Sequence, residues 1–247
     1  MRYPGAKRAA GVPETIIANI PYHENYFELY AGTGHIGLLK TPALINHFND
    51  INPKQAKYLE SKVSIVESSL SEYRAFIVSC TDALHLLKGN VYSRRDFIYL
   101  DPPYIAESRR SSRKLYKHEM LDRESHIELL QVIRSIDANI MISTKPNELY
   151  ETLLHDWRKV QIKTIDRTGK TYYEVIYMNY PDTLILHEYG YIGKDKGERQ
   201  ANKRTVRNLT GKMERLPVHL RHACIKSMVE KYPDIAQHFL NTMHRLQ

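Results

Sequence analysis

The chain has 247 residues, of which 42% are hydrophobic, a composition that suits one sizeable folded domain and excludes a disordered chain. Its formal net charge of +8 favours contact with polyanions, because a basic surface attracts phosphate groups. Only two cysteines, Cys80 and Cys224, are present, which excludes a disulfide framework and a cysteine zinc site. We expect a cytoplasmic protein without a metal, since residues 1–15 contain no apolar signal segment and no window approaches the roughly 18 apolar residues of a membrane span.

Short apolar runs rich in β-branched and aromatic residues alternate with segments of helical periodicity along the first 180 positions. The runs predict strands over residues 25–30, 43–48, 75–79, 96–100 and 139–143. Helices are predicted over 53–69, 122–135 and 148–156. Residues 159–165 and 172–180 predict a terminal hairpin whose turn lies within 166–170. This alternation predicts an α/β fold, Rossmann-like, with a largely parallel sheet whose ligands bind at the carboxyl ends of the strands.

The pattern changes after Pro181, which predicts a domain over residues 1–181 and a basic helical extension over 182–247. Residues 194–231 contain eleven Lys and Arg against four Asp and Glu. One helical face contains Val206, Leu209, Met213 and Leu216, and another contains Arg199, Lys203 and Arg207. Such a basic face is either simply solvated or contacts nucleic acid, and the pattern alone leaves both interpretations open.

A glycine-rich loop follows the first predicted strand, in the sequence YAGTGHIG. Gly32, Gly34 and Gly37 let the backbone turn tightly and approach a ligand closely, while the next helix offers free amide donors. Asp50 follows the second strand, where its carboxylate could bind the hydroxyls of a ribose. Nicotinamide dinucleotides and S-adenosylmethionine both contain adenosine, so these residues alone favour neither, and a turn without a ligand is also open.

A second motif, Asp101-Pro102-Pro103-Tyr104, ends the fourth predicted strand. The two prolines fix the backbone and remove two amide donors. The Asp101 carboxylate and the Pro103 carbonyl could then accept hydrogen bonds beside the Tyr104 ring. This arrangement suits a planar base with an exocyclic amine, although two prolines can also serve only to close a strand.

Together these motifs resemble the Dam-like, D12 class of adenine-N6 DNA methyltransferases, over residues 2 to about 180. The resemblance implies a class I methyltransferase fold and direct methyl transfer from S-adenosylmethionine to the amine of a flipped adenine in double-stranded DNA. It assigns catalysis to Asp101, Pro102, Pro103 and Tyr104. It assigns cofactor binding to Tyr3, Lys7, Glu28, Tyr30, Gly32, Gly34, Asp50, Asp82 and Asp101. Two residues depart from the family pattern, since Ala6 replaces a usual glycine and Tyr30 a usual phenylalanine.

Members of this class usually carry a recognition domain between the glycine loop and the catalytic motif. Here only 67 positions separate Gly34 from Asp101, and the predicted helices and strands fill most of them. We therefore expect residues 105–121, helped by the basic extension, to recognise the DNA sequence, although several arginines so close together suit phosphate binding as readily as guanine contacts. The basic side chains in this segment are Arg109, Arg110, Arg113, Lys114 and Lys117, and Lys7 is a further DNA-binding candidate.

Three other functions compete with a DNA-associated enzyme. An RNA adenine methyltransferase could use the same pocket and donor. A nicotinamide-dependent oxidoreductase would share the glycine loop but leaves the Asp-Pro-Pro-Tyr motif unexplained. A DNA-binding protein without catalysis would not need that motif intact. The sequence leaves open whether a companion restriction nuclease exists.

Overall fold

The computed structural model describes residues 7, 9, 11–70, 74–105, 122–165, 171–182 and 185–244. Contacts divide the chain into two units, Met1–Tyr191 and Ile192–Gln247. Seven strands form one sheet in the first unit: β1 (Asn25–Glu28), β2 (Ile45–Asn49), β3 (Ala75–Ser79), β4 (Asp96–Leu100), β5 (Asn139–Thr144), β6 (Arg158–Ile165) and β7 (Thr171–Met178). Its described helices are α1 (Val12–Ile17), α2 (His35–Leu39), α3 (Pro53–Ser69), α4 (Ala83–Gly89), α5 (Arg123–Arg134) and α6 (Glu148–Leu153).

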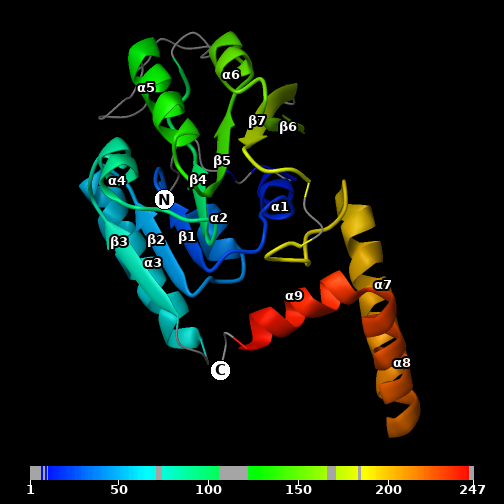
Figure 1. The fold of residues 1–247 in the computed structure, drawn as a ribbon. Helices are drawn as coiled ribbons and strands as arrows, with labels where there is room; N and C mark the ends of the chain where they lie inside the picture. Colours follow the sequence, from blue (N-terminus) through cyan, green and yellow to red (C-terminus); the bar gives the residue numbers. More distant parts are fainter. Residues whose placement is uncertain are drawn as a thin grey trace. The chain divides into compact units, whose positions relative to one another are not determined.

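The strand order is β3-β2-β1-β4-β5-β7-β6, and Figure 1 shows β3 and β6 at opposite ends of the sheet. Strands β1 to β5 pair in parallel, whereas β7 runs antiparallel to both β5 and β6. The chain order reverses between β1 and β4, which is the point where open α/β sheets bind ligands. This topology confirms the predicted α/β fold with a largely parallel sheet and a terminal hairpin.

Helices cover both faces of the sheet, and β4 at its centre is buried along its whole length. Along β4, Ile98 and Leu100 belong to the cluster formed with α4, α5 and α6. The alternate residues, Phe97 and Tyr99, belong to the cluster formed with α1, α2 and α3. Because helices cover both faces, polar side chains can contact a ligand only where the strands end, at the edges of the sheet.

The predicted strands and long helices are all present, with ends displaced by a few residues. Strand β1 ends at Glu28 instead of residue 30, because the chain turns there into the glycine loop. Helix α6 ends at Leu153 instead of residue 156. The predicted turn at 166–170 lies outside the described residues, while the pairing of Ile165 with Thr171 confirms the hairpin.

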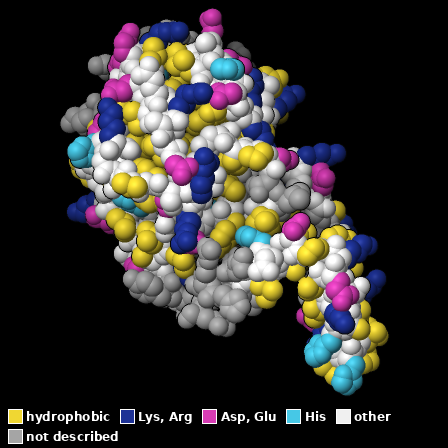
Figure 2. Space-filling view, in the orientation of Figure 1, with side chains coloured by type: hydrophobic (Ala, Val, Ile, Leu, Met, Phe, Trp, Pro, Cys, Tyr) yellow, Lys and Arg dark blue, Asp and Glu magenta, His cyan; other side chains and the backbone are white. Residues whose placement is uncertain are grey.

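The second unit is helical and exposed. It contains α7 (Lys196–Glu214), α8 (Val218–Lys231) and α9 (Pro233–His244), and neither α7 nor α8 has a buried residue. Helix α7 covers the predicted amphipathic segment up to Glu214, so Leu216 lies beyond its end, and Pro217 and Pro233 separate the helices as expected. Hydrophobic and basic side chains both appear on its visible surface in Figure 2.

Two features are absent from the described part of the chain. No helix in it is long and apolar enough to cross a membrane. The same residues contain no group of three or more His, Cys, Asp or Glu arranged to hold a metal ion.

Candidate active site

The glycine loop and Asp50 meet at the carboxyl edge of the sheet, as the parallel strands require. The Gly32 amide donates to Asp50 Oδ2 at 2.8 Å, and the Asn52 amide donates to Oδ1 at 2.9 Å. Gly32 and Gly34 have φ angles of 53° and 63°, in the left-handed region that favours glycine. At Gly34 a Cβ would also lie 2.7 Å from Leu59 Cδ2. Asp50 thus braces the loop against the end of β2 with both carboxylate oxygens.

Glu28, the last residue of β1, connects that strand to α2. Its Oε2 accepts hydrogen bonds from the Tyr26 hydroxyl and the Gly37 amide, both at 2.9 Å. Burial raises the pKa of Glu28 to about 8, although these two hydrogen bonds act in the opposite direction. The side chain therefore holds the helix that closes the glycine loop, and it is protonated at neutral pH.

Two further candidates lie at the ends of β1 and β3. Asp82 is exposed and caps α4, where its Oδ1 accepts hydrogen bonds from the amides of Leu84 at 2.7 Å and His85 at 3.3 Å. Tyr30 packs against the core cluster around α4 and α5. Burial, with a smaller effect from the Asp82 charge, raises the Tyr30 pKa above its ordinary value, so its hydroxyl stays protonated.

Asp101 follows β4 directly and is held by two donors. Lys7 Nζ lies 2.6 Å from Oδ1, and the Ser143 hydroxyl donates to the same oxygen at 3.0 Å. Ser143 has only one hydroxyl proton, so the Tyr99 hydroxyl, 3.0 Å away, must donate to Ser143. Among the described residues every hydrogen bond to this carboxylate falls on Oδ1. The arrangement fixes Asp101 from one side and leaves Oδ2 available to accept from a ligand.

The charge state of Asp101 depends on three neighbouring influences. Burial raises the pKa of Asp101 most, the Lys7 ammonium lowers it, and the Glu174 carboxylate raises it again, to about 6. Asp101 is accordingly ionised at neutral pH, when it can only accept hydrogen bonds. Its side chain remains 18% exposed, against 6% for Lys7.

Tyr104 is anchored through its hydroxyl. That group donates to Glu174 Oε2 at 2.9 Å and accepts from Lys7 Nζ at 3.1 Å. The Lys145 ammonium lies 4.8 Å from the centroid of the ring. Pro102 is buried and Pro103 partly buried, so the motif forms a fixed platform at the sheet edge.

Glu174 is a member of this site that our reading of the sequence missed. It lies on β7, it is only 2% exposed, and its Oε1 is 2.8 Å from Lys7 Nζ. The signal was present, because Glu174 is the only charged residue in β7, whose other residues are apolar or aromatic apart from Thr171. Lys7 is buried as well, with its ammonium among Asp101, Tyr104 and Glu174 instead of facing solvent.

The other predicted site residues lie outside the described part of the chain. They are Tyr3, Arg109, Arg110, Arg113, Lys114 and Lys117.

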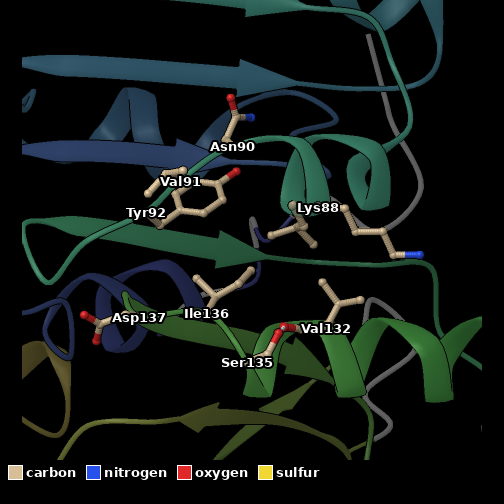
Figure 3. Close-up of a pocket in the computed structure, with 9 residues that line it drawn as sticks. Lys88, Asn90, Val91, Tyr92, Val132, Ser135, Ile136 and Asp137 are labelled. Carbon is tan, nitrogen blue, oxygen red and sulfur yellow. Dashed lines mark hydrogen bonds between the residues drawn. The ribbon is translucent and has the colours of Figure 1, made fainter.

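The structure also has a pocket of about 440 Å³ far along the strands from Asp101. Figure 3 shows it between the end of α4 and the end of α5, and Tyr92 and Asp137 place it near the starts of β4 and β5. It therefore lies at the amino edge of the sheet, and none of the predicted catalytic or cofactor residues lines it.

The sheet order with an antiparallel β7, and an Asp-Pro-Pro-Tyr site beside a glycine loop, define a class I methyltransferase fold. Residues 54–171 match the family model described as D12 class N6 adenine-specific DNA methyltransferase. This match confirms the Dam-like resemblance for the matched segment, which makes up just under half of the chain. It contains the catalytic motif, while Lys7, the glycine loop and Glu174 lie beyond its ends.

Individual relatives are more distant. The type II methyltransferase M1.LlaDCHI of Lactococcus lactis subsp. cremoris is 26% identical over 136 residues, which are 51% of this chain and 46% of the relative. The chain thus spans about half the length of the curated relative that it matches. Both the family model and this relative are described as methyltransferases, and the family model is described as specific for adenine N6 in DNA.

Solved structures show a similar fold at low identity. A putative methylase from Haemophilus influenzae has a TM-score of 0.45 and 15% identity, covering 73% of this chain and 93% of that chain. TrmK from M. capricolum, in complex with S-adenosyl-homocysteine, has a TM-score of 0.43 and 12% identity. The match covers 90% of this chain and 95% of that chain. The sheet order, more than these similarities, defines the fold class.

Proposed function

We propose that the chain is a site-specific DNA methyltransferase that transfers a methyl group directly to N6 of an extruded adenine. The observation that carries this proposal is Asp101, held at Oδ1 by Lys7 and Ser143, next to the anchored ring of Tyr104. A carboxylate with one oxygen fixed and the other available, beside an aromatic face, fits an exocyclic amine on a planar base.

Asp101 and Pro103 would act on the adenine amine together. With a pKa of about 6, Asp101 is ionised at neutral pH, and Oδ2 accepts one N–H while the Pro103 carbonyl accepts the other. These hydrogen bonds favour a pyramidal nitrogen whose lone pair points away from the ring. As the new C–N bond forms, the bond between the methyl group and the sulfonium sulfur would break and S-adenosylhomocysteine would leave. The amine then loses a proton, which Asp101 Oδ2 can take and pass to solvent.

The residues around the glycine loop fit S-adenosylmethionine. Asp50 and Asp82 offer carboxylates near the hydroxyls and the adenine of an adenosine, and Gly32 and Gly34 let the backbone approach. When bound, S-adenosylmethionine supplies an activated methyl group on a sulfonium centre. The protein contributes alignment of that group with the amine, so no covalent enzyme intermediate is needed.

The target adenine lies inside a duplex and must be extruded first. Extrusion costs a few kcal/mol in lost stacking and pairing, and stacking on Tyr104 offsets part of that cost. The hydroxyl anchors on Glu174 and Lys7 keep the ring in one orientation.

Phosphate contacts would come from basic segments beyond the pocket. We assign these contacts to Arg109, Arg110, Arg113, Lys114 and Lys117, with support from the exposed basic side chains of α7, Lys203 and Arg207. Exchanging the five basic residues of 109–117 for glutamine should weaken DNA binding and flatten its salt dependence. Unchanged affinity and unchanged site preference in that variant would refute this assignment.

Two parts of the chain have different roles in this proposal. We assign residues 1–181 to the methyltransferase domain and residues 182–247 to a basic extension that contacts chromosomal DNA in the cytoplasm, although the first compact unit continues to Tyr191.

The decisive experiment measures transfer of labelled methyl groups from S-adenosylmethionine to duplex DNA and to structured RNA, followed by mapping of modified adenines in genomic DNA. Transfer to duplex DNA at defined sites supports the proposal, whereas exclusive transfer to RNA would replace it by the RNA alternative. Asp101→Ala is the control for catalysis, which should retain the circular dichroism spectrum of the folded wild type while losing all transfer.

A further inference from the structure

Glu174 is a buried carboxylate whose partners both belong to the proposed active site. Its Oε1 lies 2.8 Å from Lys7 Nζ, and its Oε2 accepts the Tyr104 hydroxyl at 2.9 Å. Among the described residues its side chain forms hydrogen bonds and ion pairs with these two partners alone. A buried ion pair is weak evidence for stability, since apolar residues of similar volume often stabilise a core equally well. A carboxylate in this position therefore indicates a requirement of the site.

The location of Glu174 follows from the antiparallel direction of β7. Val175 pairs with Thr144, the last residue of β5, so Glu174 lies just beyond the carboxyl end of that strand. Strand β7 therefore begins at the same sheet edge at which β4 ends and Asp101 emerges. A side chain at this register can reach the catalytic motif 70 positions earlier in the sequence.

We propose that Glu174 is a positioning residue for methyl transfer, which holds the Tyr104 ring and the Lys7 ammonium in place around Asp101. This inference rests on the proposed adenine methyltransferase activity. Two anchors on one hydroxyl prevent the Tyr104 ring from tilting, so the extruded base meets a preformed stacking face. Glu174 also balances the charge of Lys7, which would otherwise be shared only with Asp101.

The two carboxylates are linked through the cation between them. Lys7 lowers the pKa of Asp101, while Glu174 raises it. Removing the negative charge of Glu174 should therefore lower the pH at which Asp101 becomes ionised. A residue that served only the packing of β7 would leave that pH unchanged, which gives the inference its own measurable signature.

The test uses Glu174→Gln, which preserves the shape of the side chain and an oxygen for the Tyr104 hydroxyl. We expect kcat to fall about tenfold, because a charge-assisted hydrogen bond is roughly twice as strong as a neutral one. The KM for S-adenosylmethionine should stay unchanged, and the acid limb of the pH profile should move to lower pH. The matched control is Glu151→Gln. Glu151 is an exposed residue of α6 that forms an ion pair with Lys159, and its substitution should change none of these quantities.

A second variant keeps the test decisive if Glu174→Gln folds poorly. Tyr104→Phe removes the anchored hydroxyl from the other side and keeps the ring. Combined with Glu174→Gln, it should cost little more than either change alone, because both break the same contact. Fluorescence of 2-aminopurine at the target position should show a smaller extruded fraction in both single variants.

The outcomes separate this inference from the proposed function. If the wild type transfers no methyl group to nucleic acid, the proposed function fails. If the wild type is active and Glu174→Gln retains its kcat and pH profile, the positioning role fails while the function stands. Additive effects of the two substitutions on kcat would overturn the inference as well.

Discussion

Removing the Lys7 ammonium should destabilise the protein strongly and in a pH-dependent manner. Lys7 is 6% exposed, with Asp101 at 2.6 Å and Glu174 at 2.8 Å. Burial lowers the pKa of Lys7, but the two carboxylates outweigh it and hold the pKa well above the ordinary value, so the group stays charged. In Lys7→Met two buried carboxylates would face each other without a cation. Breaking one partner of a buried pair costs about 3–5 kcal/mol, and we expect a loss of that size at pH 8.

The pH dependence follows from the folded-state pKa of Asp101. Burial already raises this pKa to about 6, and loss of Lys7, which lowers it, would raise it further. A carboxyl group with a raised folded pKa destabilises the protein as pH rises from its unfolded pKa towards its folded pKa. At pH 5 Asp101 of the variant is protonated and the repulsion is relieved. The free energy of unfolding should therefore fall less at pH 5 than at pH 8.

The assay is denaturant unfolding of the wild type, Lys7→Met, Glu174→Gln and the double variant at both pH values. The double variant should recover part of the loss, because it no longer contains two facing carboxylates. Lys159→Met, which removes an exposed ion pair with Glu151, is the control and should cost no more than about 1 kcal/mol. Equal losses at pH 5 and pH 8, with additive single changes, would refute the reasoning.

Three further results are expected. Methyl transfer should rise with pH along a limb centred near 6 as Asp101 ionises, and a pH profile of kcat that is flat between 5 and 7 would contradict this. Gly37→Ala should cost roughly 1–3 kcal/mol in unfolding, since the added Cβ would lie 2.5 Å from Phe48 Cε1, whereas Gly89→Ala, with no atom within 4 Å, should be neutral or stabilising. Glu28→Gln should raise the melting temperature at pH 8 but not at pH 4. The pKa of Glu28 is about 8 in the folded protein against about 4.5 in the unfolded chain, so the native protein loses stability as the pH rises between these two values.

Much of the fold was predictable because the central strands β4 and β5 are buried on both faces. Such strands appear in sequence as continuous apolar runs, as β4 does at FIYL, and parallel strands bring their carboxyl ends to one edge. That rule alone placed Asp50 and Asp101 at the same edge as the glycine loop. Helices α1 and α4, of six and seven residues, were not predicted, because segments so short show too few turns for a clear period.

The ion pairs of the site were not predictable from spacing. Lys7 and Asp101 are 94 positions apart, and a lysine side chain is ordinarily expected to be exposed to solvent. Its burial follows from two carboxylates that come from different strands, β4 and β7. The partner of Lys7 could be identified only when both strand directions were known.

Glu174 nevertheless illustrates what strand direction adds to a sequence pattern. In a parallel strand a charge matters for ligands when it follows the last apolar residue, as Asp101 follows Leu100. Because β7 is antiparallel, its beginning lies at the edge where the parallel strands end. An acidic residue just before the apolar run of β7 therefore corresponds to an acidic residue just after the apolar run of a parallel strand. Glu174 directly precedes Val175, the residue that pairs with the end of β5. An isolated acid at the start of the last antiparallel strand of such a sheet should therefore be tested as a site residue, as Asp101 would be.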